Sequence, residues 1–194
     1  MSVYVEEQVT PNPNAMKYVT SRDVLVSGKI TFQDPSECAD VPMACVLFQL
    51  EHVSQIHLFE NVVTVTHDGQ ANWDTLGPSV IDAIRAHVET HDPRFNEKAE
   101  AERQAELNGL PEDVQQINKI LDEYIRPALQ GDGGDLTVVR YDTETHKLFV
   151  SYEGACGSCP SSTTGTLMAI QGILADEFDP DIDVVAVDGE PSYH

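Results

Sequence analysis

The stretch of residues 92–111 constrains the fold of this chain more than any other segment. It consists mainly of Glu, Lys, Arg, Gln and Ala, and between Phe95 and Leu107 it holds no large apolar residue. A segment of this composition can bury little surface, so it predicts a charged linker, which these residues allow to be helical. The 194 residues are therefore expected to form two small domains, 1–91 and 112–194, instead of one large domain.

The first domain is expected to be α+β. Short β-rich runs such as 61–66 end in turn signals and predict strands, and the apolar stretch 42–50 carries proline where a helix can begin. In the stretch 73–88, apolar residues recur at steps of four, which predicts an amphipathic helix on which Trp73 packs in the core.

The second domain is also expected to be α+β, in the order α-β-β-α-β. An amphipathic helix covers 112–129, and Pro127 should kink or weaken it. A hairpin follows, with strands in 136–141 and 147–152, and the apolar residues of 167–178 predict a second helix before a last strand.

The charge of the chain argues against two classes of partner. Thirty-three acidic residues against eleven Lys and Arg give a net charge of −22, which repels nucleic-acid phosphates and anionic lipids. The N-terminus lacks the pattern of an export signal, and no apolar run is long enough to cross a membrane. We therefore expect no nucleic-acid or membrane partner and a cytoplasmic location, where a close pair of cysteines more often serves metal or redox chemistry than a structural disulfide.

The segment Cys156-Gly157-Ser158-Cys159-Pro160 lies between a predicted strand and a predicted helix. Two intervening residues let both sulfurs face one metal centre, and Pro160 is suited to the first turn of the helix. The positive end of the helix dipole would then favour the thiolates that iron requires.

The spacing alone leaves three interpretations open. A zinc site needs four ligands, and this domain offers no second Cys-x-x-Cys and only isolated histidines, His146 and His194. A thioredoxin-type thiol–disulfide oxidoreductase would carry the pair after the first strand of a βαβ unit, whereas here it follows a hairpin. An iron–sulfur site is favoured, with the oxidoreductase as the main alternative.

Several further motifs occur with the cysteine pair. They are Arg126-Pro127-Ala128-Leu129, Asp132-Gly133-Gly134-Asp135, Gly154-Ala155-Cys156 and Cys159-Pro160-Ser161-Ser162-Thr163. With them the segment 114–187 resembles the NifU C-terminal, or Nfu, domain. Residues 10–91 resemble the Nfu N-terminal domain through the run from Thr10 to Tyr18 and through Trp73. One residue more than the family pattern precedes Thr166-Leu167, which affects the expected helix near Gly165.

The resemblance implies an iron–sulfur cluster scaffold or carrier and not an enzyme. Two chains would each supply Cys156 and Cys159 to one bridging [4Fe–4S] cluster, making a homodimer when loaded, and the cluster would pass to apo iron–sulfur proteins. Cluster assembly machinery would be a further partner. A cluster of this kind takes four thiolates, and this site offers two.

The remaining candidate ligands have simpler interpretations. Cys45 lies in an apolar run, so Cys38 and Cys45 are expected to serve packing or to have no role, with an auxiliary metal or redox site as the alternative. His87 and His91 end a predicted helix, where a favourable charge at the helix C-terminus is a better explanation than a metal site.

Overall fold

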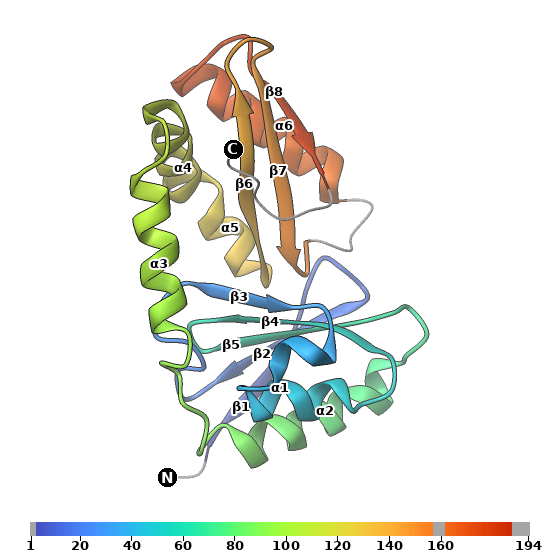
Figure 1. Cartoon of the computed structure of the whole chain (residues 1–194). Helices are drawn as coiled ribbons and strands as arrows, with labels where there is room; N and C mark the ends of the chain where they lie inside the picture. The colour runs from blue at the N-terminus through green and yellow to red at the C-terminus, as the bar shows by residue number, and fades with distance from the viewer. Residues whose placement is uncertain (1–2, 157–161, 188–194) are drawn as a thin grey trace.

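The N-terminal unit, residues 3–91, is a five-stranded antiparallel sheet with helices on one of its faces (Figure 1). The computed structural model describes residues 3–156 and 162–187, with side chains of the second range described from residue 165. The strands of this unit are β1 (Val5–Val9), β2 (Ala15–Thr20), β3 (Lys29–Phe32), β4 (Val53–Phe59) and β5 (Val62–His67). The helices are the short η1 (Pro35–Cys38), α1 (Pro42–Phe48) and α2 (Trp73–His87). The strand order is β1-β2-β5-β4-β3.

Alternation along the strands gives this sheet one apolar and one polar face. Ile56 and Leu58 of β4 pair with Val65 and Val63 of β5, and all four are fully buried against α1 and α2. The residues between them on each strand are polar and point to the opposite face. The apolar face accounts for the core of the unit, so its polar face is available for another role.

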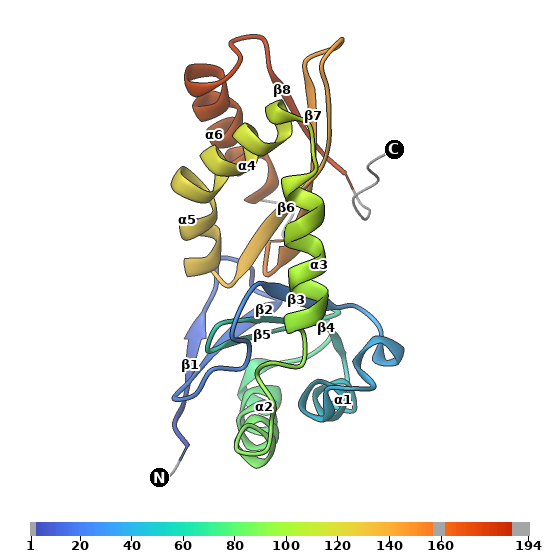
Figure 2. The same cartoon turned by 60° about the vertical axis from the view of Figure 1, so that its left-hand side comes forward.

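The C-terminal unit, residues 112–187, carries its helices on one face of a three-stranded sheet (Figure 2). Its elements are α4 (Glu112–Tyr124), α5 (Arg126–Gly131), β6 (Gly134–Asp142), β7 (Lys147–Gly154), α6 (Ser162–Glu177) and β8 (Asp183–Ala186). Strands β6 and β7 form an antiparallel hairpin, and β8 pairs with β7 in parallel after the crossover through α6. A second hydrophobic core, separate from the first, lies between this sheet and its helices.

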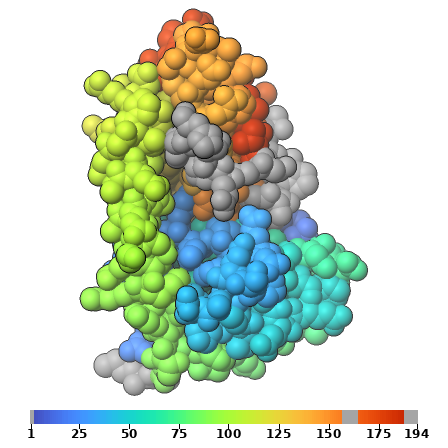
Figure 3. Space-filling model, viewed as in Figure 1, coloured from blue at the N-terminus to red at the C-terminus, as the bar shows by residue number. Residues whose placement is uncertain are grey.

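Helix α3 (Glu97–Asn108) lies within the predicted linker and runs along the side of both units (Figure 3). It is mostly exposed, but Glu100 is buried against Gly28 of the N-terminal unit and pairs with Arg103 at 2.8 Å. The charged stretch is thus a helix that is attached to the first unit through one acidic side chain.

The predicted α+β class is confirmed, and so is the effect of Pro127. Helix α4 ends at Tyr124 and α5 begins at Arg126, which places Pro127 in the first turn of the new helix. Helix α6 is continuous across Gly165, so the extra residue of this segment does not interrupt it. Among the described residues, no helix is both long and apolar enough to cross a membrane.

Candidate functional site at the end of strand β7

Cys156 lies two residues beyond the end of β7, where the chain turns from the hairpin towards α6. Its residue surface is only 8% exposed, and its side chain joins the second hydrophobic core. Cys159, the other predicted ligand, lies outside the described residues. Strand β7 ends at the base of the C-terminal unit, at the end that faces the N-terminal sheet (Figure 1), and Cys156 follows that end by two residues.

Two glycines allow the close packing at this turn, Gly134 beside Cys156 and Gly154 beside the backbone of Gly133. A Cβ atom on Gly134 would lie 2.5 Å from Cys156 Sγ and 2.8 Å from both Cys156 N and Glu153 O. Gly154, which pairs with Gly134 across the hairpin, has φ +60, and a Cβ atom on it would lie 2.6 Å from Gly133 O. Both positions exclude a side chain, so two glycines of the recognised motifs have a steric reason to be present.

The tyrosine nearest the cysteine supplies a buried hydroxyl group. Burial, and after it the charge of Cys156, raise the pKa of Tyr152 to about 12. Within the described residues, the Tyr152 hydroxyl is buried and lacks a hydrogen-bond partner. It therefore stays protonated at neutral pH, as a donor close enough to respond to charge on Cys156.

Two acidic residues flank the site but are engaged in ion pairs. Asp135 and Glu153 lie 3.3 and 3.2 Å from Lys29 Nζ, and Arg126 Nε approaches Asp135 at 3.6 Å. Burial on its own would raise the pKa of Glu153, but Lys29, Thr137 and His57 outweigh it, so the pKa is lowered. Both carboxylates are held in ion pairs with Lys29 or Arg126, so neither is a free ligand beside Cys156.

The N-terminal unit touches the site directly. Asn12 donates a hydrogen bond of 2.9 Å from Nδ2 to the backbone oxygen of Ala155, the residue before Cys156. The sequence marked Asn12 only as part of the run from Thr10 to Tyr18. No pattern along the chain marks Asn12 or Lys29 as part of the site, because each belongs to the other unit and is more than 100 residues away from its partner.

The interpretation of Cys38 and Cys45 requires a correction. Cys38 is fully buried in the first core, as packing would require, but the two cysteines are joined by a disulfide between η1 and α1, with their Cα atoms 5.5 Å apart. The seven-residue separation allows this pairing because the short turn between the two helices brings both side chains together. This pair is a covalent brace of the N-terminal unit.

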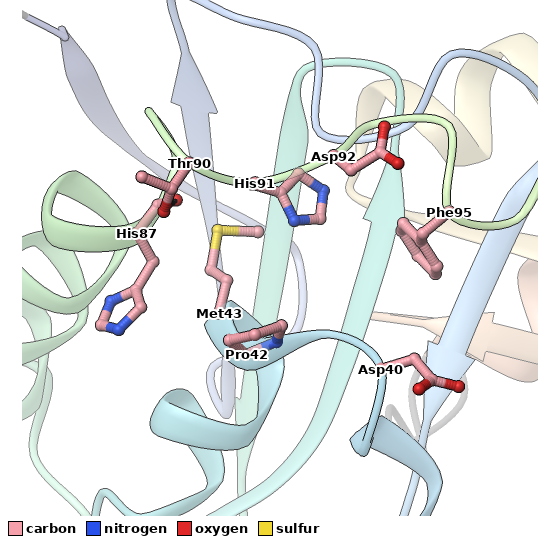
Figure 4. A pocket seen from close by; sticks show the side chains of 8 residues that line it. All are labelled: Asp40, Pro42, Met43, His87, Thr90, His91, Asp92 and Phe95. Carbon is pink, nitrogen blue, oxygen red and sulfur yellow. Dashed lines mark hydrogen bonds between the residues drawn. The ribbon is translucent and has the colours of Figure 1, made fainter.

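His87 and His91 line a small cavity of about 140 Å³ with Asp40, Met43 and Phe95 among its walls (Figure 4). The two rings are already engaged: His87 Nδ1 lies 2.9 Å from Ala83 O, and His91 Nε2 lies 2.6 Å from Val24 O. Among the described residues, no three His, Cys, Asp or Glu side chains are grouped to hold a metal ion. The two histidines thus have structural contacts in this pocket.

These features define a protein of two α+β units, with a cysteine packed beside a glycine at the junction between the units. The family model described as NifU-like domain matches residues 117–185, and the model described as Scaffold protein Nfu/NifU N terminal matches residues 5–91. The chain belongs to this NifU-like, or Nfu, family.

Individual relatives give the same result. NifU-like protein 5, mitochondrial, of Arabidopsis thaliana is 28% identical over 175 residues, covering 89% of this chain and 64% of that protein. The NFU1 iron-sulfur cluster scaffold homolog, mitochondrial, of Drosophila persimilis is 31% identical, covering 89% and 61%. The chain thus spans less than two thirds of the length of these relatives.

Among solved structures, the NifU-like protein from Saccharomyces cerevisiae has a TM-score of 0.41 and 21% identity. The match covers 45% of this chain and 80% of that one.

Proposed function

We propose that this protein is a carrier of a [4Fe–4S] cluster, held by the thiolates of Cys156 and Cys159, and that it is not an enzyme. The observation that carries the proposal is the position of Cys156, in a family-matched segment, at a turn where Gly134 leaves space for its sulfur. The name of the Drosophila persimilis relative, an iron–sulfur cluster scaffold homolog, supports the same role.

The number of thiolates supports a bridge between two chains. A [4Fe–4S] cluster takes four cysteine ligands, whereas Cys156 and Cys159 supply two. Asp135 and Glu153, which flank the site, are paired with Lys29 and cannot complete the set. Cys38 and Cys45 are bonded to each other in the N-terminal unit. A second copy of the chain is therefore the simplest source of the other two thiolates.

A carrier also has to release its cargo. The two ligand cysteines of each chain are only three positions apart in the sequence. Their thiolates can therefore be exchanged for those of a recipient without unfolding of either core. We propose apo iron–sulfur proteins as recipients, cluster assembly machinery as a further partner and no nucleic acid or membrane as partner. The division into domains 1–91 and 112–194 with the linker 92–111, and a cytoplasmic location, belong to the same proposal.

Anaerobic reconstitution with iron and sulfide tests this function. The loaded protein should turn brown with a broad absorption band in the visible range, and Cys156→Ser or Cys159→Ser should abolish iron binding while the circular dichroism spectrum stays native. The matched control is the double change Cys38→Ala with Cys45→Ala, which should keep the iron. A colourless wild type that reduces disulfides would instead establish the oxidoreductase, and iron retained by both serine variants would refute the assigned ligands.

A further inference from the structure

The polar face of the N-terminal sheet is covered, although its residues are those of a solvent-facing surface. Lys17, Thr64, His57 and Thr31 are successive cross-strand neighbours on β2, β5, β4 and β3, so they form one polar row across the sheet. Thr64 is 0% and His57 2% exposed. A row of this composition is buried only when another part of the molecule lies on it.

The base of the C-terminal hairpin is the part that covers this row. Strands β4 and β5 both contact β7. A Cβ atom on Gly154 would lie 3.1 Å from the His57 ring, and one on Gly133 would lie 3.0 Å from Thr64 Oγ1. Lys17 Nζ donates to Gly131 O at 2.6 Å. The two units thus meet through polar side chains on one side and mostly backbone on the other.

Lys29 is the charged anchor of this interface. The side chain of Lys29 is 9% exposed, and its Nζ lies 3.3 Å from Asp135 Oδ1, 3.2 Å from Glu153 Oε1 and 2.7 Å from Leu136 O. Glu153 also accepts a hydrogen bond of 3.3 Å from Thr31. A cation that bridges two desolvated carboxylates holds the units together only while all three groups are in place, since removal of one leaves buried charge unpaired.

This anchor acts close to Cys156. Glu153 precedes the cysteine by three residues, and Asn12 holds Ala155, the residue immediately before it. In this closed arrangement 8% of the Cys156 surface is exposed. Contacts made by the N-terminal unit therefore lie on the stretch of backbone that presents the thiol.

The interface also carries groups that favour its separation. His57 Nε2, Thr64 Oγ1 and Thr66 Oγ1 are buried with no hydrogen-bond partner in the described part of the chain. Burial without a partner costs free energy that is regained when water reaches these atoms. Each unit keeps its own hydrophobic core, so separation exposes polar surface and leaves both cores intact.

We propose that Lys29, Asp135 and Glu153 form a reversible latch that holds the backbone leading to Cys156 against the polar face of the N-terminal sheet. In the closed form this backbone is fixed and the thiol stays packed in the second core. In the open form the backbone is released, and the thiol can turn outward to a second copy of the chain or to a recipient. Only the identity of the partner that reaches the thiol rests on the proposed function. The effect of the latch on access to Cys156 is a property of the unloaded chain.

The rate of Cys156 alkylation in the full, unloaded and reduced chain tests the latch. Iodoacetamide is the probe, and peptide mass analysis reports Cys156 separately from the other cysteines. Lys29→Met keeps the length of the side chain but removes its charge, and we expect alkylation to be roughly tenfold faster or more. Lys98→Met is the matched control, because Lys98 Nζ pairs with Glu102 on the exposed helix α3 and its side chain is 91% exposed. It should react at the wild-type rate.

Two further variants exclude a general loss of structure as the explanation. Glu153→Gln weakens the latch from the other unit and should also accelerate alkylation, whereas Lys29→Arg keeps the charge and should stay close to wild type. Small-angle X-ray scattering should show a larger radius of gyration for Lys29→Met and Glu153→Gln, with native circular dichroism. Equal alkylation rates in Lys29→Met, Glu153→Gln and Lys98→Met would overturn the latch. A wild type that binds no iron would overturn the proposed function and leave these rates unaffected.

Discussion

Substitution of Gly134 by alanine should destabilise the C-terminal unit and disturb Cys156 in one step. The added methyl group would lie 2.5 Å from Cys156 Sγ and 2.8 Å from two backbone atoms, where ordinary contacts of a Cβ atom begin at 3.4 Å. Atoms must therefore move by several tenths of an ångström or more. The strand cannot yield easily, because Gly134 pairs with Gly154 and the next pair, Asp135 with Glu153, is held by Lys29.

An added methyl group in a tightly packed site costs about 1–3 kcal/mol. Since the contacts include backbone atoms on both sides, we expect the upper half of this range, about 2–3 kcal/mol. For a unit of the size of residues 112–187, each kcal/mol lowers the melting temperature by about 4–8 °C. Thermal unfolding followed by circular dichroism should show the decrease, and iron analysis after reconstitution should show less bound iron because the sulfur has been displaced.

Gly172→Ala is the matched control in the same unit. A Cβ atom at Gly172 would meet nothing within 4 Å, and the residue lies in the interior of helix α6. There alanine is the better helix former, so this variant should be more stable by about 0.5–1 kcal/mol and should bind iron normally. If Gly134→Ala melts and binds iron like wild type, the steric account of the glycine motif is wrong.

Two further predictions concern the N-terminal unit. Burial, opposed by the charges of Glu153 and Asp135 and supported by that of Lys29, lowers the pKa of His57 to about 4, whereas an exposed histidine takes up its proton near pH 6.5. The closed form is therefore fully favoured above about pH 6.5 and loses up to about 3 kcal/mol as the pH falls towards 4. Cys156 alkylation, corrected for thiolate content with a model thiol, should rise between pH 7.5 and 5 in wild type and much less in His57→Gln. An identical pH profile in both would contradict this assignment. The double change Cys38→Ala with Cys45→Ala should lower stability by about 2–3 kcal/mol in thermal unfolding, because the disulfide closes a short loop of the unfolded chain. Unchanged stability in that variant would show that the disulfide does not brace the unit.

Local pattern was sufficient for the fold class, because both units follow the periodicity of their apolar residues. The stripe of 73–88 became α2, and the glycine and proline signals located the breaks at Pro127 and before β6. Strand β3 and the pairing of β1 with β2 were not anticipated. Their stability comes from partners distant along the chain and from packing, which single-sequence periodicity does not contain.

Of the candidate site, the sequence predicted only the cysteine motif. Motif and spacing led to Cys156, but they could not indicate Lys29 or Asn12, whose role depends on how the two units meet. The same limit explains Cys38 and Cys45: the short separation and the apolar surroundings predicted packing, whereas the pairing follows from the turn between η1 and α1. Contacts between elements far apart along the chain have no periodic signature in one sequence.

The central claim is that two chains share one cluster through Cys156 and Cys159, and native mass measurement combined with iron and sulfide analysis tests it most directly. Loading should convert the unloaded chain to twice its mass of 21.3 kDa plus one cluster, with about four irons and four sulfides per two chains, and chelation should reverse the change. Higher salt should favour the loaded dimer, because it screens the repulsion between two chains of net charge −22. A single chain that retains a complete four-iron cluster would contradict the account.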